Sequence, residues 1–257
     1  MVDADNSART ADDLSYLDNI HQGRRCFICC TGPSLGEITT EQWAEIDKDI
    51  TIGVNTIAAT HPKTDYLVII EDFTPLMAFV SMSEAKTKLV WEQHANHREC
   101  FKEYKQFRIH DSKPYFAPSI NEGMVILGTV ACTAINLAYI MGCNPIILLG
   151  VDFNNQAHAV PLPGDDPEKW YELAKPGRLG SKFEQPHQRR GVTELRNTAE
   201  FCEEKGVKVY NANLNSYIES FEKKPLETIL SANPAPKPKR KSHRPNTGPK
   251  RKQRDTA

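Results

Sequence analysis

Short apolar runs alternate with polar or amphipathic stretches along most of the chain. The segment from Arg24 to Cys30 is one such run, and Ile-Ile-Leu-Leu forms the centre of the most hydrophobic one, 145–151. Brief apolar runs that are rich in β-branched residues and bounded by turn residues are typical of buried strands. This pattern predicts strands at 24–30, 49–54, 66–70, 107–109, 145–151 and 207–210.

The stretches between these runs predict helices. Thr39 and Thr40 offer hydroxyl groups that can cap a short helix reaching Ile46, and the apolar residues of 128–141 suit a helix buried against a sheet. Further helical segments are predicted at 75–105, 192–205 and 217–230, with a loop rich in Pro, Gly and Asp at 160–186. Strands that alternate with helices predict an α/β fold, namely a Rossmann-like, mostly parallel sheet with helices on both faces.

Composition divides the chain into three parts. Residues 1–22 are polar and are interpreted as a flexible segment, 23–232 as a Rossmann-like domain, and 233–257 as a disordered tail rich in Lys, Arg and Pro. The tail holds nine basic residues and one acidic residue, whereas the rest of the chain holds 23 basic and 32 acidic residues. Any nonspecific contact with a polyanion must therefore come from the tail, and the alternative interpretation is a tail that only keeps the protein soluble.

Several classes of protein are disfavoured by the sequence. No apolar stretch reaches the length of a membrane-spanning helix, and the first residues lack the apolar core of a signal peptide. Seven cysteines are scattered through apolar runs, which indicates reduced, buried thiols rather than a disulfide framework. We therefore expect a cytoplasmic protein without a membrane span.

The first candidate site is the turn Thr31-Gly32-Pro33-Ser34, directly after the first predicted strand. Ligands of open α/β sheets bind beyond the carboxyl ends of strands, where Gly lets the backbone approach a phosphate. The turn lacks both the Gly-Lys-Ser/Thr of a P-loop and the three glycines of a dinucleotide fingerprint. An ordinary strand-to-helix turn explains its local sequence equally well. As a nucleotide site, it predicts that Gly32→Val abolishes nucleotide binding and leaves the fold largely intact.

Polar residues follow other predicted strands as well. Asn55 could contact a ribose or a base, or cap the next turn. Asp152 follows the most hydrophobic strand, with His158 six residues later, and could hold a metal or a substrate hydroxyl, or cap its own loop. Asp72 follows a third strand, and two converging carboxylates would favour Mg²⁺. His187 lies where a long loop meets a helix, as a candidate general base or an ordinary surface histidine.

Four blocks in this order resemble a known superfamily. Cys29-Cys30-Thr31-Gly32-Pro33-Ser34-Leu35 is followed by Val54-Asn55, by the predicted helix near 128–142, and by Ile146-Ile147-Leu148-Leu149-Gly150-Val151-Asp152-Phe153. These blocks resemble the bacterial sialyltransferases of glycosyltransferase family 42. They are equally similar to the 6-hydroxymethylpterin diphosphokinase MptE-like family and its motility-associated glycosyltransferase relatives. The resemblance spans roughly residues 24–230 and implies a nucleotide-dependent transferase.

The resemblance also implies roles for individual residues. Gly32, Pro33 and Ser34 match the nucleotide-phosphate loop of the sialyltransferases, and Asn55 matches their nucleotide-contacting Asn. Thr129 falls in the segment that contacts the donor, and His187 matches the general base.

Other positions depart from the sialyltransferases. Thr31 replaces an Asn, Leu127 replaces an Arg, and Asn154 and His158 lie about where those enzymes have tyrosines, which argues against CMP-sialic acid as the donor. Asp152 with His158 fits the Gly-x-Asp…His pattern of the MptE-like branch better.

The function predicted first is a glycosyltransferase that uses a nucleotide-sugar donor and a small-molecule or glycan acceptor. The amides and hydroxyl of 32–34 would hold the phosphate, Asn55 would orient the nucleoside, His187 would accept the proton, and Asp152 would hold substrate or Mg²⁺. The alternative is pyrophosphoryl transfer from ATP to a hydroxymethylpterin, with Asp152 and Asp72 on Mg²⁺. A third reading, based only on the tail, is a nucleic-acid-associated binding protein with a degenerate site.

Overall fold

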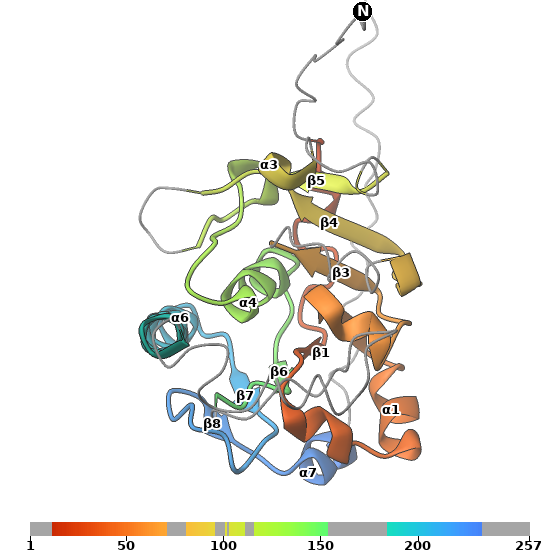
Figure 1. Cartoon of the computed structure of the whole chain (residues 1–257), viewed down its shortest axis with the longest axis vertical. Helices are drawn as coiled ribbons and strands as arrows, with labels where there is room; N and C mark the ends of the chain where they lie inside the picture. The colour runs from red at the N-terminus through yellow and green to blue at the C-terminus, as the bar shows by residue number, and fades with distance from the viewer. Residues whose placement is uncertain are drawn as a thin grey trace, which may run out of the picture.

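The computed structural model describes residues 12–70, 81–95, 101, 103–110, 116–153 and 184–232, with the side chains of helix α6 described from Arg190 onward. The described strands form one eight-stranded sheet in the order β5-β4-β3-β2-β1-β6-β7-β8, and every neighbouring pair is parallel (Figure 1). The predicted parallel α/β fold is thus confirmed. The strands are β1 Cys26–Cys29, β2 Ile50–Val54, β3 Tyr66–Ile69, β4 Thr87–Trp91, β5 Lys105–Phe107, β6 Ile146–Leu149, β7 Val209–Asn211 and β8 Glu222–Lys223.

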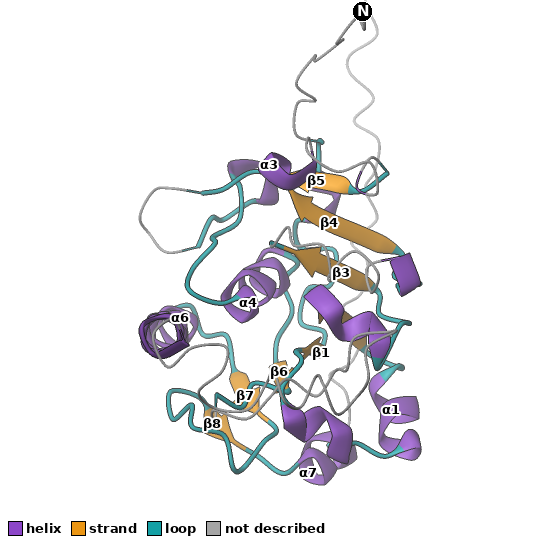
Figure 2. Ribbon diagram, viewed as in Figure 1, coloured by secondary structure: helices purple, strands orange, loops and turns teal. Residues whose placement is uncertain are grey.

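Helices cover both faces of the sheet (Figure 2). Helices α4 and α6 lie on one face, and α1 and α7 lie on the other together with the 3₁₀ turns η2 and η3. The described helices and turns are η1 Ser15–Leu17, η2 Pro33–Glu37, α1 Thr40–Ile46, η3 Asn55–Ala59, α3 Glu92–Ala95, η5 Ile120–Glu122, α4 Val130–Ile140, α6 Glu184–Glu204 and α7 Leu226–Ser231. None of the described helices is long and apolar enough to cross a membrane.

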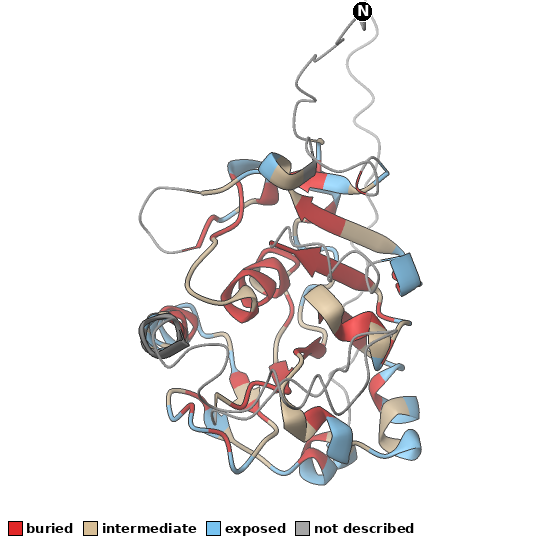
Figure 3. Ribbon diagram, viewed as in Figure 1, coloured by how far each residue is buried: buried red, intermediate tan, exposed pale blue. Residues whose placement is uncertain are grey.

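Strand β1 shows how the two faces are filled. Successive side chains of a strand point to opposite faces, so Cys26 and Ile28 join the core under α4 and α6, whereas Phe27 and Cys29 join the core under α1 and α7. Strands β1, β2, β3 and β6 are accordingly buried at every position and α4 almost throughout (Figure 3). The described cysteines are all buried and free, as the sequence predicts for those positions.

Two of the predicted helices, α1 and α4, are found where their local sequences predict them. Thr39 and Gln42 form a capping box at the start of α1, because each side chain accepts a hydrogen bond from the other residue's backbone N–H. Helix α4 begins at Val130 and ends at Ile140, just before Gly142, and its small apolar side chains let it pack across β1, β2 and β3.

Three predicted elements are wrong. Strand β4 lies inside the segment predicted to be helical, because only Leu89 and Val90 are fully buried there and polar neighbours hide the pattern. The helix predicted at 217–230 is a loop, the short strand β8 and α7, which starts only after Pro225. Helix α6 begins at Glu184 rather than near 192, because a Pro in the first turn of a helix breaks no helical hydrogen bond.

The core extends into the segment 1–22 that the sequence analysis assigns to a flexible lead-in. Leu14 and Leu17 are each 1% exposed and belong to the core cluster under α4. Part of this segment therefore belongs to the packed structure.

A buried ion pair fixes the end of α7 to the sheet. Arg25, directly before β1, contacts Asp49, directly before β2, with a separation of 2.6 Å between Nη2 and Oδ2. The same guanidinium donates hydrogen bonds to the carbonyl oxygens of Ile229 and Ala232, at 2.5 and 3.2 Å. Cations are favourable at the carboxyl end of a helix, and here the cation is also paired with a carboxylate. Helix α7 therefore ends at the amino-terminal edge of the sheet.

A pH-dependent contribution to stability is expected from His21, whose Nε2 lies 2.8 Å from the hydroxyl of Tyr66. Burial, and after it the charge of Arg24, hold the pKa of His21 below its ordinary value of 6.5. The folded chain thus binds this proton less readily than the unfolded chain. The stabilising contribution is complete above pH 6.5 and declines as the pH falls through that value. Urea unfolding at pH 7.5 and 5.5 should show a larger loss for the wild type than for His21→Gln. Equal losses would contradict this expectation.

Candidate functional site

The polar residues singled out in the sequence leave the sheet at one edge. Strand β1 pairs with β2 on one side and β6 on the other, with Cys29 level with both Gly53 and Leu149. Strand order along the chain reverses between β1 and β6, so their exits form the topological switch point at which open α/β sheets bind ligands. The 31–34 turn, Asn55 and Asp152 follow β1, β2 and β6 respectively. Their exits therefore meet at this point.

Asp152 binds the turn that follows β1. Its Oδ2 accepts a hydrogen bond from the backbone N–H of Ser34 at 2.8 Å, and its Oδ1 accepts one from the Ser34 hydroxyl at 2.6 Å. Asn213 donates to the same Oδ1 through its amide nitrogen, at 2.7 Å. The carboxylate is 2% exposed and accepts three hydrogen bonds, which compensates the burial of its charge. Asp152 thus joins the exits of β1, β6 and β7.

Gly32 lies against the β6 exit so closely that no side chain fits. A Cβ at this position would lie 2.4 Å from the carbonyl oxygen of Gly150 and 2.6 Å from Oδ2 of Asp152. The Gly32 N–H donates to that carbonyl oxygen at 2.9 Å. The Gly in this turn is therefore required for packing of the two exits.

These contacts alter the role expected of the 31–34 turn. The Gly32 amide, the Ser34 amide and the Ser34 hydroxyl already have acceptors within the protein, and Pro33 has no N–H. The donors of the predicted phosphate loop are thus bonded within the protein, where they hold Asp152 and Gly150.

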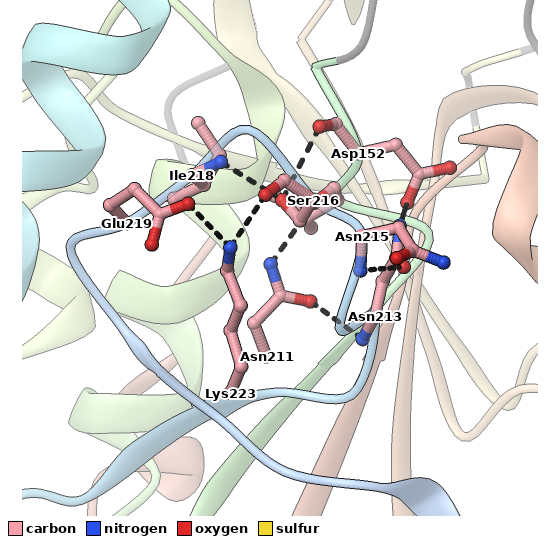
Figure 4. A network of polar contacts seen from close by, with 9 residues as sticks. Asp152, Asn211, Asn213, Asn215, Ser216, Ile218, Glu219 and Lys223 are labelled. Carbon is pink, nitrogen blue, oxygen red and sulfur yellow. Dashed lines mark hydrogen bonds and ion pairs between the residues drawn. The ribbon is translucent and has the colours of Figure 1, made fainter.

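The loop after β7 supports Asp152 from behind (Figure 4). The Ser216 hydroxyl donates to the carbonyl oxygen of Val151 at 2.7 Å, and the Asn211 amide donates to the same oxygen at 3.1 Å. The Tyr217 N–H donates to the carbonyl oxygen of Asp152 at 2.9 Å. Both peptide groups that carry Asp152 are therefore fixed by this loop.

Further hydrogen bonds make the loop rigid. The side-chain oxygen of Asn213 accepts the Asn215 N–H at 2.9 Å, and the Lys223 ammonium donates to the Ser216 carbonyl oxygen at 2.7 Å and to Glu219 at 2.6 Å (Figure 4). The sequence assigns no element and no site to residues 211–216, which lie between the strand predicted at 207–210 and the helix predicted at 217–230. The run Asn-Ala-Asn-Leu-Asn-Ser after β7 is a usable signal, since it is again a polar group at a strand exit.

Asn55 follows β2 with a positive φ of 44°, a conformation that Asn tolerates better than most residues. Its side-chain oxygen is buried, and no described residue donates a hydrogen bond to it. The capping role considered as an alternative is not observed, because this oxygen accepts no hydrogen bond from a described residue. A buried acceptor without a partner in the protein is unusual and marks Asn55 as a candidate contact for a donor group of a ligand.

Thr129 caps α4, with its hydroxyl accepting the Ala131 N–H at 3.4 Å. Helix α4 ends beside the start of β1, where the Gly23 N–H donates to the carbonyl oxygen of Gly142 at 2.7 Å, so its amino-terminal end points to the edge that carries the strand exits. Phe153 packs here against α6, where a Cβ at Gly191 would lie 2.8 Å from its ring. The starts of α4 and of the described part of α6 thus adjoin the exit of β6.

The thiol nearest to the site is Cys30. Burial, and after it the charge of Asp152, raise the pKa of Cys30 well above its ordinary value. A thiol that stays protonated is a poor nucleophile. Cys30 is therefore a packing residue.

Several predicted residues lie outside the described part of the chain. Asp72, His158 and the tail 233–257 belong to segments that the structure does not describe. His187 lies in the first turns of α6 and not on the preceding loop, which corrects its predicted setting, but its side chain is not described. Among the described residues, no three His, Cys, Asp or Glu side chains converge as a metal site. With its carboxylate already bonded to Ser34 and Asn213, Asp152 alone does not fit Mg²⁺.

A cleft of about 230 Å³ opens beside the Asp152 contacts. Ser34 and Gly150 lie at its inner end. One wall is formed by η2 and α1, and the other by the loop after β7 and the start of α7. The cleft is hereafter called the α1–α7 cleft.

The fold and this edge define a Rossmann-like α/β protein with its candidate site at the switch point of the sheet. Residues 4–158, more than half of the chain, match the sequence model of the family described as 6-hydroxymethylpterin diphosphokinase MptE-like. The chain belongs to this family. No curated protein matches the sequence significantly.

Solved structures with similar folds are bacterial transferases. The sialyltransferase CstII from Campylobacter jejuni, in complex with the substrate analogue CMP-3FNeuAc, has a TM-score of 0.51 at 17% identity, over 82% of this chain and 89% of that one. The α-2,3-sialyltransferase Cst-I from the same organism has a TM-score of 0.50 at 14% identity, over 82% of each chain. The MAf glycosyltransferase from Magnetospirillum magneticum AMB-1 has a TM-score of 0.49 at 16% identity. That match covers 83% of this chain but only 37% of the larger protein.

Proposed function

We propose that the protein is a nucleotide-dependent glycosyltransferase that binds a nucleotide-sugar donor at the switch point. One observation carries the proposal: the exits of β1 and β6 are packed together through Gly32 and Asp152, with the unpaired oxygen of Asn55 at the adjoining exit of β2. The sialyltransferase CstII binds the substrate analogue CMP-3FNeuAc, which supports the same kind of ligand here.

The phosphate of the donor would lie near the start of α4. The donors of the 31–34 turn are engaged within the protein, whereas α4 directs its dipole and its first N–H groups, capped by Thr129, to the same edge. Asn55 would accept a hydrogen bond from the nucleoside. In this arrangement the 31–34 turn forms the bottom of the site, and the start of α4 binds the charged phosphate.

The chemical step would be attack of an acceptor hydroxyl on the donor sugar, with departure of the nucleotide. His187 is proposed as the group that takes the hydroxyl proton, with His158 as the competing assignment. Asp152 is proposed as a positioning residue, because its hydrogen bonds fix the two loops that bound the site. No metal is required by this role.

Pyrophosphoryl transfer from ATP is the second candidate, favoured by the match to a family described as diphosphokinase-like. In that reaction Mg²⁺ would be needed at the phosphates. Asp72, which is proposed to contribute with Asp152, lies outside the described residues.

Nucleotide binding tests the two candidates directly. Melting temperatures measured with CMP, UDP, UDP-sugars, CMP-sugars and ATP are expected to rise with a pyrimidine nucleotide, in EDTA as well as in Mg²⁺. Asn55→Gly removes the side chain but permits the positive φ, and should weaken that nucleotide about tenfold through loss of one hydrogen bond.

The matched control is Gln93→Ala, a change at an exposed position of α3 that should leave nucleotide affinity unchanged. A shift with ATP that requires Mg²⁺, and none with pyrimidine nucleotides, would establish the diphosphokinase alternative. Absence of a shift with every nucleotide would refute both.

A further inference from the structure

The α1–α7 cleft lies on the other side of the switch point from Asn55. Its inner end is formed at the exits of β1, β6 and β7, by Ser34, Leu149, Gly150 and Asn213. Asn55, by contrast, follows β2, on the far side of β1. A ligand that spans a switch point places its parts over the two halves of the sheet. If the nucleoside lies over the β2 half, the cleft is the space available to the other reactant.

The cleft is lined by oxygen acceptors and amides. Glu37 and Glu227 contribute carboxylates, and the amide of Gln42 on α1 donates to Glu227 on α7 at 3.0 Å. Asn213 and Asn215 of the loop after β7 add amides to the lining. Carboxylates accept hydrogen bonds from hydroxyl groups, and amides can both donate and accept.

The charge of the lining is one-sided. Among the residues that the structure describes, the lining of the cleft includes two glutamates and no lysine, arginine or histidine. An anion near Glu37 and Glu227 would be repelled by both carboxylates and would meet no cation among these lining residues. The apolar floor of Leu149 and Leu226 offers a surface for the C–H face of a ring. This chemistry suits a neutral, hydroxyl-rich molecule and disfavours an acidic one.

Hydrogen bonds also connect the wall of the cleft to the proposed nucleotide site. Asn213 faces the cleft and donates to Asp152, which in turn holds Ser34 at the inner end. The loop that carries Asn213 is fixed by the Ser216 and Lys223 hydrogen bonds. The cleft therefore keeps its shape next to the point where the donor would react.

We propose that the α1–α7 cleft is the acceptor subsite and that it binds an uncharged sugar ring. This inference rests on the proposed glycosyl transfer and adds to it the class of the acceptor. It excludes acceptors whose reacting ring carries a carboxylate or phosphate.

Galactose and galacturonate are the probes, because they share one ring and differ in a carboxylate. Amide resonances of the full-length protein are to be followed by NMR as each sugar is added. Galactose is expected to shift the backbone amides of Leu214, Asn215 and Glu227, with galacturonate binding at least about tenfold more weakly. The double variant Glu37→Gln, Glu227→Gln should bring the two affinities within about twofold of one another. Glu45→Gln, an exposed change at the far end of α1, is the matched control and should keep the difference.

Equal affinity for the two sugars, shifts confined to residues outside the cleft, or no shift with galactose would each overturn the inference. Titration of the same sample with the nucleotide that raises the melting temperature separates the two proposals. Nucleotide shifts at Asn55 and Thr129 without galactose shifts in the cleft would leave glycosyl transfer standing and remove the subsite. Galactose shifts in the cleft without any nucleotide binding would leave a sugar-binding cleft and remove the proposed function.

Discussion

Replacing Asp152 by Asn is expected to lower the free energy of unfolding by about 2–4 kcal/mol and turnover by more than about 100-fold. The substitution keeps the shape of the side chain but removes its negative charge. That charge accepts three hydrogen bonds, two from Ser34 and one from Asn213. It also turns an NH₂ group toward at least one of those donors. Urea unfolding and an activity assay with the donor identified by melting temperature measure the two effects.

A double-mutant cycle with Ser34→Ala shows whether Asp152 acts through the turn. If Asp152 positions the turn, the two changes should be coupled by about 1–3 kcal/mol in stability, and the double variant should be little worse than Asp152→Asn alone. If Asp152 instead acts as a metal ligand, stability without metal should be unchanged and Ser34→Ala should stay active. Independent effects on stability would contradict the positioning role.

Gly32→Ala is expected to abolish nucleotide binding and to destabilise the fold by roughly 2–4 kcal/mol. The added Cβ would meet the Gly150 carbonyl oxygen at 2.4 Å and the Asp152 carboxylate at 2.6 Å, so the two exits must separate. The sequence-based expectation that Gly32→Val leaves the fold largely intact is corrected by these contacts. Gly36→Ala, in the same turn with no atom within 4 Å of the new Cβ, is the control. Wild-type stability of Gly32→Ala would show that the turn is more pliable than its contacts indicate.

The centre of the sheet was predictable because its strands are apolar on both faces. Strands β1, β2, β3 and β6 are buried at every position, so each reads as a continuous apolar run. At the edges this signal fails. In β4, Thr87, Lys88 and Trp91 are only partly buried, and the run looks polar. Edge strands are therefore decided by pairing with a neighbour, which the local sequence does not contain.

The edge of the sheet that carries the candidate site was predictable from the sequence, but the hydrogen bonds within the site were not. A Gly-containing turn, an Asn and an Asp after three neighbouring strands of the sheet were enough to locate the edge, because carboxyl ends of parallel strands meet there. That the donors of Ser34 would be used by Asp152 depends on contacts between residues 118 positions apart. Asn213 was missed for the same reason, since its role appears only when the exit of β7 is placed beside that of β6.

Helix α7 runs from the edge of the sheet that carries the strand exits to the opposite edge. It starts with Leu226 at the α1–α7 cleft and ends where Arg25 holds the carbonyl oxygens of Ile229 and Ala232, at the opposite edge of the sheet. The two edges are separated by the length of a strand, about 15 Å. A resin or dye attached at the exposed Ser231 is thus held at the edge opposite the strand exits. Coupling at that position suits binding measurements that need the strand exits unobstructed.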